Sequence, residues 1–343
     1  MEPQNILVRM PNWVGDLVMA TPVLADLRAK YPNASITAMC KAPVCELLKE
    51  DESIDELFCF TKPQNGFLRR QMKRSIINKM IQGKYDLGLL LTNSFSSAWW
   101  FWQGRVPKRI GFLRPMRRWL LTDPVIFPEK KEHQVVTYKR LLEPLGIPIS
   151  STKPRLYVSD KEVAEAKELL HQRGYRLGQT LIGMNPGAAY GSAKCWPPER
   201  FRELALRLVS QKETVVVFFG DASTETLIKQ ICQGLPESVM NLAGVTSLRE
   251  LACIIKSCDL LVTNDSGPMH IGAAFNIPLI AFFGSTDLEK TGPYGQSEAV
   301  IHKQVSCSPC FKRVCPIDFR CMREIEVDEV FARAQKLLTG RSC

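Results

Sequence analysis

Two kinds of hydrophobic pattern alternate along the chain. Short apolar runs, of the kind that parallel sheets bury on both faces, are separated by longer segments whose apolar residues recur with helical spacing. The runs predict strands at 5–10, 35–40, 56–60, 85–91, 180–185, 214–220, 259–264 and 279–283. The longer segments predict helices at 17–30, 44–49, 69–82, 160–172, 198–210, from 223, from 247 and at 326–338. This alternation predicts an α/β fold with a parallel sheet in each half.

The chain is long enough for two domains. Its 343 residues are roughly twice the length of a typical domain. The stretch "PLGIPISSTKP" at 144–154 is rich in proline, glycine and serine, which makes it the best candidate linker. We therefore expect one Rossmann-like domain over residues 1–150, a second over 151–325, and a C-terminal helix and tail over 326–343.

Two predicted helices carry signals of their local geometry. Pro22 lies inside the first, where a proline removes an interior hydrogen bond, so we expect a short first turn and a kink at Pro22. Ser247 and Glu250 match the capping box, which predicts that a helix begins at this point.

The composition is that of an ordinary globular protein. Hydrophobic residues make up 45% and charged residues 23% of the chain. No window offers the roughly 18 consecutive apolar residues that a membrane-spanning helix needs. The first apolar run, "ILVRM", lacks the preceding basic region of a secretory signal, so we expect no export by that route and mostly reduced thiols among the 12 cysteines.

The net charge of +10 is concentrated in one segment. Residues 62–118 contain thirteen Lys or Arg and one acid, Asp86, which gives this segment +12. The same segment contains the aromatic run "AWWFWQG" and is followed closely by Trp119. Basic residues among aromatics suit an anionic amphiphile, a membrane surface or a nucleic acid. The alternative is a solvated basic face beside an aromatic core.

The first predicted strand ends in "MPNWVGD", residues 10–16. No GxGxxG is present, so the dinucleotide-binding fingerprint is not supported. Asp16 instead follows a glycine where the strand turns into a helix. It is either the N-cap of that helix or a general base for an acceptor hydroxyl.

A second candidate site is the loop "PGAAYGSAKCWP" at 186–197. Small residues such as Gly187 and Ala189, which precede Tyr190, allow the backbone to approach a phosphate, and Lys194 supplies a compact positive charge for that phosphate. The spacing is not that of a P-loop, and a surface loop with an isolated lysine is the alternative. The loops at 218–221 and 242–247, the latter with Thr246, follow other strands and are expected to line the same crevice.

The segment "VTNDSGPMHIGAAFNIPLIAFFG" at 262–284 predicts a strand, a helix and a second strand. In the simplest interpretation Asp265 caps the helix, while Gly267 and Pro268 fit the turn into it. That interpretation does not explain His270. Because βαβ units bind phosphates where the helix begins, the segment is a candidate nucleotide site.

Four cysteines lie close together near the C-terminus, at Cys307, Cys310, Cys315 and Cys321. A Cx2C pair followed by Cx5C could bind zinc, but these intervals differ from those of the usual structural sites. Reduced thiols or a disulfide are the alternatives, and we expect no metal site.

Three blocks together, "NWVGDLVMATPVLADLRAKYP", "NPGAAYGSAKCWPPERFRELA" and the 262–284 segment, resemble the ADP-heptose:lipopolysaccharide heptosyltransferases, glycosyltransferase family 9. Their order and separation match, and the resemblance covers nearly the whole chain. "LTNSFSSA" and "CSPCFKRVCP" look most like the heptosyltransferase II branch of this family.

The resemblance implies a GT-B fold, with two Rossmann-like domains whose parallel sheets face one another across a cleft. It implies inverting transfer without a required metal or cofactor. Asp16 would be the catalytic base, and Lys194 would bind the donor diphosphate and stabilise the departing ADP. The remaining donor contacts would come from Asp265, Ser266, Gly267 and His270 around the phosphates and ribose, and from Gly187, Ala189, Tyr190 and Thr246 in neighbouring loops. Family members often have hydroxyl residues where Ala189 and Tyr190 stand.

The implied activity transfers L-glycero-D-manno-heptose from ADP-heptose to the heptosyl-Kdo2-lipid A inner core of lipopolysaccharide. The partners would be ADP-heptose, an anionic lipid A-type acceptor and the inner face of the cytoplasmic membrane, on which a cytoplasmic protein would sit peripherally; no nucleic acid is expected. One alternative is a family 9 enzyme for another sugar or acceptor, of the heptosyltransferase I or III type. Another alternative is a basic nucleic-acid-binding protein that has a zinc site. The last is a non-catalytic homologue of the family.

Overall fold

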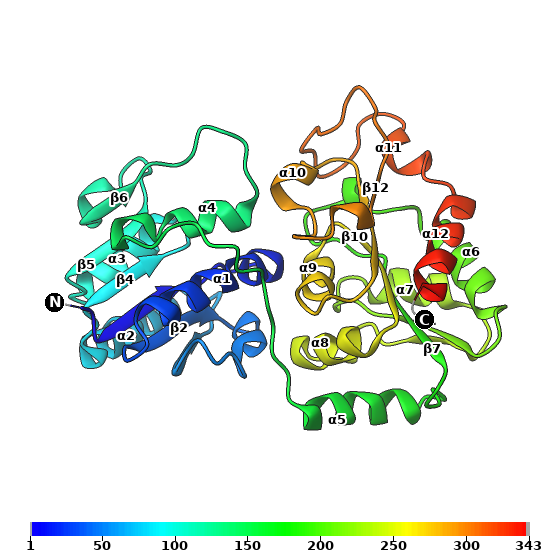
Figure 1. The fold of residues 1–343 in the computed structure, drawn as a ribbon, viewed down its shortest axis with the longest axis horizontal. Helices are drawn as coiled ribbons and strands as arrows, with labels where there is room; N and C mark the ends of the chain where they lie inside the picture. The colour runs from blue at the N-terminus through cyan, green and yellow to red at the C-terminus, as the bar shows by residue number, and fades with distance from the viewer. Residues whose placement is uncertain (1, 341–343) are drawn as a thin grey trace. The chain divides into compact units, whose positions relative to one another are not determined.

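The computed structural model describes residues 2–340, which form two compact units that meet in sequence between Tyr157 and Val158. Each unit is an α/β fold around one six-stranded parallel sheet. In Figure 1 the first unit runs from blue to green and the second from green to red. The predicted fold class, two Rossmann-like units with parallel sheets, is confirmed.

The first sheet has the strand order β3-β2-β1-β4-β5-β6. The chain builds outward from β1 to β3, returns to pair β4 with the other side of β1, and then builds outward to β6. The carboxyl ends of β1 and β4 therefore lie at the point where the winding reverses, which is where doubly wound sheets bind ligands. The strands are β1 Asn5–Arg9, β2 Ser35–Lys41, β3 Glu56–Phe60, β4 Leu87–Leu90, β5 Lys108–Phe112 and β6 Asp123–Val125.

Helices of the first unit cover this sheet in two pairs, α1 with α4 and α2 with α3. The predicted helix at 44–49 is a 3₁₀ turn, and α1 begins three residues before the predicted start because Leu17 N–H already bonds the Trp13 carbonyl. The helical elements are α1 Val14–Lys30, η1 Val44–Leu48, α2 Gly66–Gly83, α3 Phe95–Gln103, η2 Arg118–Leu120, α4 Gln134–Arg140 and η3 Glu143–Leu145.

Helix α1 continues through Pro22 rather than breaking into a short first turn. Proline has no N–H to offer the carbonyl of Val18, four residues before it. The hydroxyl of Thr21 donates to that carbonyl instead, at 2.9 Å, and accepts from the backbone N–H of Arg155 at 3.0 Å. Thr21 thus supplies the hydrogen bond that Pro22 cannot make. It also anchors the chain at Arg155, beyond η3, to helix α1.

Replacing Thr21 by Val is expected to destabilise the protein by about 1–3 kcal/mol, because the isosteric side chain leaves the buried Val18 carbonyl and Arg155 N–H without their shared partner. Urea unfolding followed by circular dichroism measures this. Thr21→Ser keeps the hydroxyl and serves as the matched control. Equal midpoints for the Val and Ser variants would contradict the assigned role.

The second sheet has the strand order β12-β11-β10-β7-β8-β9, so the winding reverses between β7 and β10. The strands are β7 Thr180–Asn185, β8 Thr214–Phe218, β9 Val239–Asn241, β10 Leu260–Asn264, β11 Leu279–Phe283 and β12 Val300–His302. The helical elements are α5 Asp160–His171, η4 Ser192–Lys194, α6 Pro198–Val209, α7 Glu225–Cys232, α8 Leu248–Ser257, α9 Gly267–Ala274, α10 Leu288–Thr291, η5 Ser297–Ala299, α11 Arg320–Arg323 and α12 Val327–Thr339.

The predicted capping box at Ser247 and Glu250 is confirmed at the start of α8. A second capping box, which was not predicted, joins Ser159 and Glu162 at the start of α5. Glu162 also forms an ion pair with Arg249 of α8 at 2.7 Å, and this pair fastens the two helices together.

Candidate functional site

The candidate site of the second unit lies at the carboxyl edge of its sheet, where β7 and β10 are neighbours. Asn264, the last residue of β10, holds both ends of the loop that follows β7. Its side-chain amide donates to the Pro186 carbonyl at 2.7 Å, and its amide oxygen accepts from the Trp196 N–H at 2.9 Å. Because Asn264 is buried, these two bonds fix the loop to the neighbouring strand.

Asn185, the last residue of β7, makes the reciprocal connection. Its amide donates to the Ser266 hydroxyl at 2.8 Å and to the Gly187 carbonyl at 3.1 Å. The two asparagines therefore cross-link the 186–196 loop and the start of α9. Neither asparagine was among the candidates, since a terminal strand residue gives no signal of its side-chain partners.

An ion pair joins the two candidate segments. Lys194 Nζ lies 2.5 Å from Asp265 Oδ2, and the two side chains are 13% and 4% exposed. The hydroxyl of Thr286, just after β11, also donates to this carboxylate. Asp265 is therefore not the helix cap that the simplest interpretation assigned to it; the N-cap is Ser266. Its carboxylate instead holds the lysine at the edge of the sheet.

Helix α9 begins beside this ion pair. Pro268 occupies its first turn, as predicted, and the side chain of Ser266 makes no capping bond to that turn. The first-turn N–H groups of a helix attract anions, and the macrodipole adds to that attraction. Gly267 and the buried His270 lie in the same short helix. Lys194, Asp265, Ser266 and the α9 N-terminus thus form one charged, partly buried edge.

Tyr190 connects this edge to residues 307–321, the segment that contains the four neighbouring cysteines and is called the cysteine-rich segment below. Lys194 Nζ lies 5.0 Å and the Arg313 guanidinium 5.5 Å from the centroid of its ring, within the range of cation–π contact. The Tyr190 hydroxyl donates to the Phe311 carbonyl at 2.7 Å. Tyr190 thus places a second cation, Arg313, near Lys194; Arg313 was not among the residues predicted from the sequence.

The backbone of the same loop also contacts the cysteine-rich segment. Gly191 has a φ of +152°, and a Cβ at this position would lie 2.3 Å from the Arg313 carbonyl oxygen. That carbonyl accepts the N–H of Ala193 at 2.9 Å. Only glycine fits here, because both the backbone conformation and the space exclude a side chain.

Gly191→Ala is expected to lower the midpoint of thermal unfolding and to weaken nucleotide binding, since the loop that carries Lys194 must move away from Arg313. The loss of stability should be about 1–3 kcal/mol. Scanning calorimetry with and without ADP measures both effects. Gly174→Ala, at another positive φ but with no atom near its Cβ, isolates the backbone strain from the collision. Identical behaviour of the two variants would contradict the proposed collision.

The four cysteines of this segment are free thiols. Within residues 2–340, no group of three or more His, Cys, Asp or Glu side chains has an arrangement that could hold a metal ion. The zinc alternative therefore gains no support. The segment is held by other bonds, from Phe311 N–H to the Ser285 carbonyl and from the Ser308 hydroxyl to the Gly284 carbonyl, each at 2.6 Å.

The remaining candidates of this unit lie along the same edge of the sheet. Gly187 packs against Thr224, and an added Cβ would lie 2.7 Å from that side chain. Ala189 is exposed in the 186–197 loop. Thr246 follows the edge strand β9, two strands away from β7, and precedes α8.

Asp16 belongs to the first unit and lies in the first turn of α1. Trp13 is the N-cap of this helix, so the N-cap interpretation of Asp16 is wrong. Its carboxylate accepts a hydrogen bond of 2.9 Å from the phenol of Tyr138 in α4. Burial, and secondarily the neighbouring charge of Asp16, raise the pKa of Tyr138 well above its usual value, so the phenol stays protonated and donates at neutral pH. Tyr138 was not a sequence candidate.

The sequence and the fold are similar to those of one family of known proteins. The family model of glycosyltransferase family 9 (heptosyltransferase) matches residues 73–319. The lipopolysaccharide heptosyltransferase 2 of Escherichia coli K12 is 33% identical over 309 residues, which cover 87% of each chain. The lipooligosaccharide heptosyltransferase 2 of Haemophilus influenzae is 32% identical over 313 residues, 87% of this chain and 88% of the relative.

The similarity extends to solved structures. A structure titled E. coli ADP-heptose lps heptosyltransferase II superposes with a TM-score of 0.85 at 28% identity, and the match covers 99% of this chain and 100% of that one. The family model spans most of the chain, and the curated relatives exceed 30% identity over more than two thirds of it. The chain therefore belongs to glycosyltransferase family 9, the heptosyltransferases.

Proposed function

We propose that the protein transfers L-glycero-D-manno-heptose from ADP-heptose to the heptosyl-Kdo2-lipid A inner core, the reaction of the second heptosyltransferase of lipopolysaccharide synthesis. The observation that carries the proposal is the Lys194–Asp265 pair beside the N-terminus of α9, a charged edge at the winding reversal of the second sheet. It is supported by the two curated relatives described above, which are 32% and 33% identical and are both named heptosyltransferase 2.

In this proposal the second unit binds the donor. A lysine ammonium has three donors, and Asp265 takes only one of them, so the others are available to the diphosphate. Asp265 fixes the position of the ammonium, and the first turn of α9 adds N–H groups for a phosphate or ribose oxygen. Gly187, Ala189, Tyr190, Thr246, Ser266, Gly267 and His270 complete the donor contacts.

Asp16 then acts as the general base. Its carboxylate accepts the proton of the acceptor hydroxyl as that oxygen attacks the anomeric carbon, and the bond from this carbon to the ADP oxygen breaks. Attack from the side opposite the leaving group inverts the configuration. Lys194 compensates the negative charge that develops on the departing ADP, so no metal or cofactor is required.

The acceptor is an anionic glycolipid, and the first unit provides complementary charge. The segment 62–118 carries the +12 excess, and most of it belongs to α2 and to the loops that follow α3 and β5. None of the described helices is both long and apolar enough to cross a bilayer. We place the protein in the cytoplasm, peripherally on the inner face of the inner membrane, and assign it no nucleic-acid partner.

The test is a transfer assay with ADP-heptose and heptosyl-Kdo2-lipid A, read by mass spectrometry, in the presence and absence of EDTA. Addition of one heptose at equal rates in both conditions is the expected result. Product without EDTA but none with it would overturn the metal-free mechanism. ADP binding without product would show that the sugar or the acceptor is wrong, and retention on nucleic acid without ADP binding would favour the basic-scaffold alternative.

A further inference from the structure

An exposed aromatic cluster covers the outer face of α3 in the first unit. Phe95, Trp99 and Trp102 follow one another at intervals of four and three residues and therefore lie on one side of this helix. The opposite side, with Ala98 and Phe101, is buried in the core. A surface helix ordinarily places polar residues on its outer face, so this aromatic stripe is not explained by folding of the unit.

Trp119 of η2 extends the stripe into a continuous cluster. Its ring centroid lies 6.1 Å from that of Trp99, 6.2 Å from that of Phe95 and 6.3 Å from that of Trp102. Trp99 and Trp102 are themselves 4.9 Å apart. We call these four residues the aromatic cluster. The exposed fractions of Phe95, Trp102 and Trp119 are 43%, 45% and 58%, so the cluster presents a large apolar surface to solvent.

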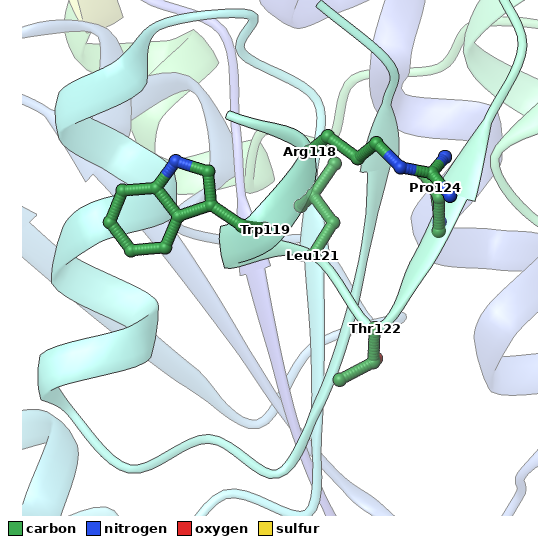
Figure 2. Close-up of a pocket in the computed structure, with 5 residues that line it drawn as sticks. All are labelled: Arg118, Trp119, Leu121, Thr122 and Pro124. Carbon is green, nitrogen blue, oxygen red and sulfur yellow. The ribbon is translucent and has the colours of Figure 1, made fainter. Parts of the chain in front are cut away.

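Cations adjoin the aromatic cluster. Arg118 precedes Trp119, and the two side chains extend in opposite directions from η2 (Figure 2). Both residues line a pocket of about 300 Å³. Arg105, just beyond the end of α3, is also exposed. Helix α2, which packs beside α3, has no acidic residue and carries Arg69, Arg70, Lys73, Arg74 and Lys79.

These α2 cations are not neutralised by the protein. Among residues 2–340 none of them pairs with a carboxylate, and Phe67 and Leu68 add exposed apolar surface where α2 begins. Tryptophan rings surrounded by Lys and Arg are characteristic of surfaces that lie at a membrane–water interface, where the rings enter the headgroup region and the cations attract anionic lipids. A second protein chain would not require so large an excess of one charge.

We propose that the aromatic cluster and the cations of α2 form the surface by which the enzyme docks on an anionic phospholipid bilayer. This inference rests on the proposed function, since an enzyme whose acceptor is a membrane glycolipid must work at a bilayer. It goes beyond that function by naming the docking surface. The rings supply salt-resistant binding, and the cations supply a contribution that depends on anionic lipid and is screened by salt.

The test is co-sedimentation with vesicles of about three parts phosphatidylcholine to one part phosphatidylglycerol, compared with phosphatidylcholine alone. Trp102→Ala is expected to weaken partitioning into the mixed vesicles by about tenfold, because roughly half of the ring becomes buried in the interface. Trp102→Tyr should recover most of the affinity. Leu177→Ala removes an apolar side chain of the second unit that is more exposed than Trp102, 87% against 45%, and serves as the control.

A separate assay distinguishes failure of the docking surface from failure of the proposed function. Transfer to the acceptor saccharide without its acyl chains does not need a bilayer, so Trp102→Ala should leave that rate unchanged while it slows transfer in vesicles. Equal vesicle binding by wild type and Trp102→Ala would overturn the docking surface, whatever the transfer result. Equal binding to vesicles with and without phosphatidylglycerol would also overturn it. So would the finding that the protein is a dimer, that Trp102→Ala dissociates this dimer, and that vesicle binding does not change.

Discussion

Asp16→Asn is expected to reduce kcat by about 10²–10⁴-fold, the range that a positioned general base contributes. The amide has nearly the shape of the carboxylate but cannot accept the acceptor's proton. Because Asp16 lies in a different unit from Lys194 and Asp265, the affinity for ADP should not change. Steady-state kinetics and calorimetric titration with ADP measure the two quantities. Near-normal turnover would remove the base assignment.

Tyr138→Phe is the companion variant. It removes the phenol that donates to Asp16 but leaves the carboxylate in place. We expect kcat to fall by about tenfold, with little change in the KM of either substrate, because the carboxylate loses a fixed orientation rather than its basicity. A loss as large as that of Asp16→Asn would mean that Tyr138 itself takes part in proton transfer.

Lys194→Met is expected to weaken ADP binding by about 10–100-fold, the contribution of a hydrogen bond to a charged group. It should also lower the free energy of unfolding by about 3 kcal/mol, because Asp265 is left as an unpaired charge in a buried position. Titration with ADP and urea unfolding measure these effects. The conservative control is Lys212→Met, at an exposed position of the same unit.

The double variant Lys194→Met, Asp265→Asn separates the two roles of this lysine. Neutralising the aspartate removes the buried charge, so most of the lost stability should return. The affinity for ADP should not return, because the cation that faces the diphosphate is still missing. Recovery of both would show that Lys194 acts only as the structural partner of Asp265.

The hydrophobic pattern predicted eight of the twelve strands in the two sheets, because these strands are continuous apolar runs. Helix α3 was not predicted, because "FSSAWWFWQ" is apolar on both faces and lacks a polar side. Its inner face packs on the core, and the Ser94 side chain caps its first turn. The early start of α1 was also missed, since Val14 and Gly15 add nothing to the helical period.

The candidate site was predicted one segment at a time, and the contacts between segments were not. The motifs identified Lys194 and Asp265 separately, but local pattern does not show that β7 and β10 are neighbours and so bring the two side chains together. The same limitation applies to Tyr138 and Asp16, which are 122 residues apart in sequence. The bond between Tyr190 and Phe311 likewise exists only in the folded unit.

The links from Asn264 to the 186–196 loop, and from that loop to Arg313, have a consequence for synthesis on the ribosome. Lys194 emerges long before the residues that position it, so a nascent chain that ends before β10 carries the lysine without Asp265 or the N-terminus of α9. Domains fold as units, the N-terminal one first. The first unit can therefore complete its sheet before the nucleotide site that we propose for the second unit exists, and the proposed binding of ADP would arise only near the end of translation.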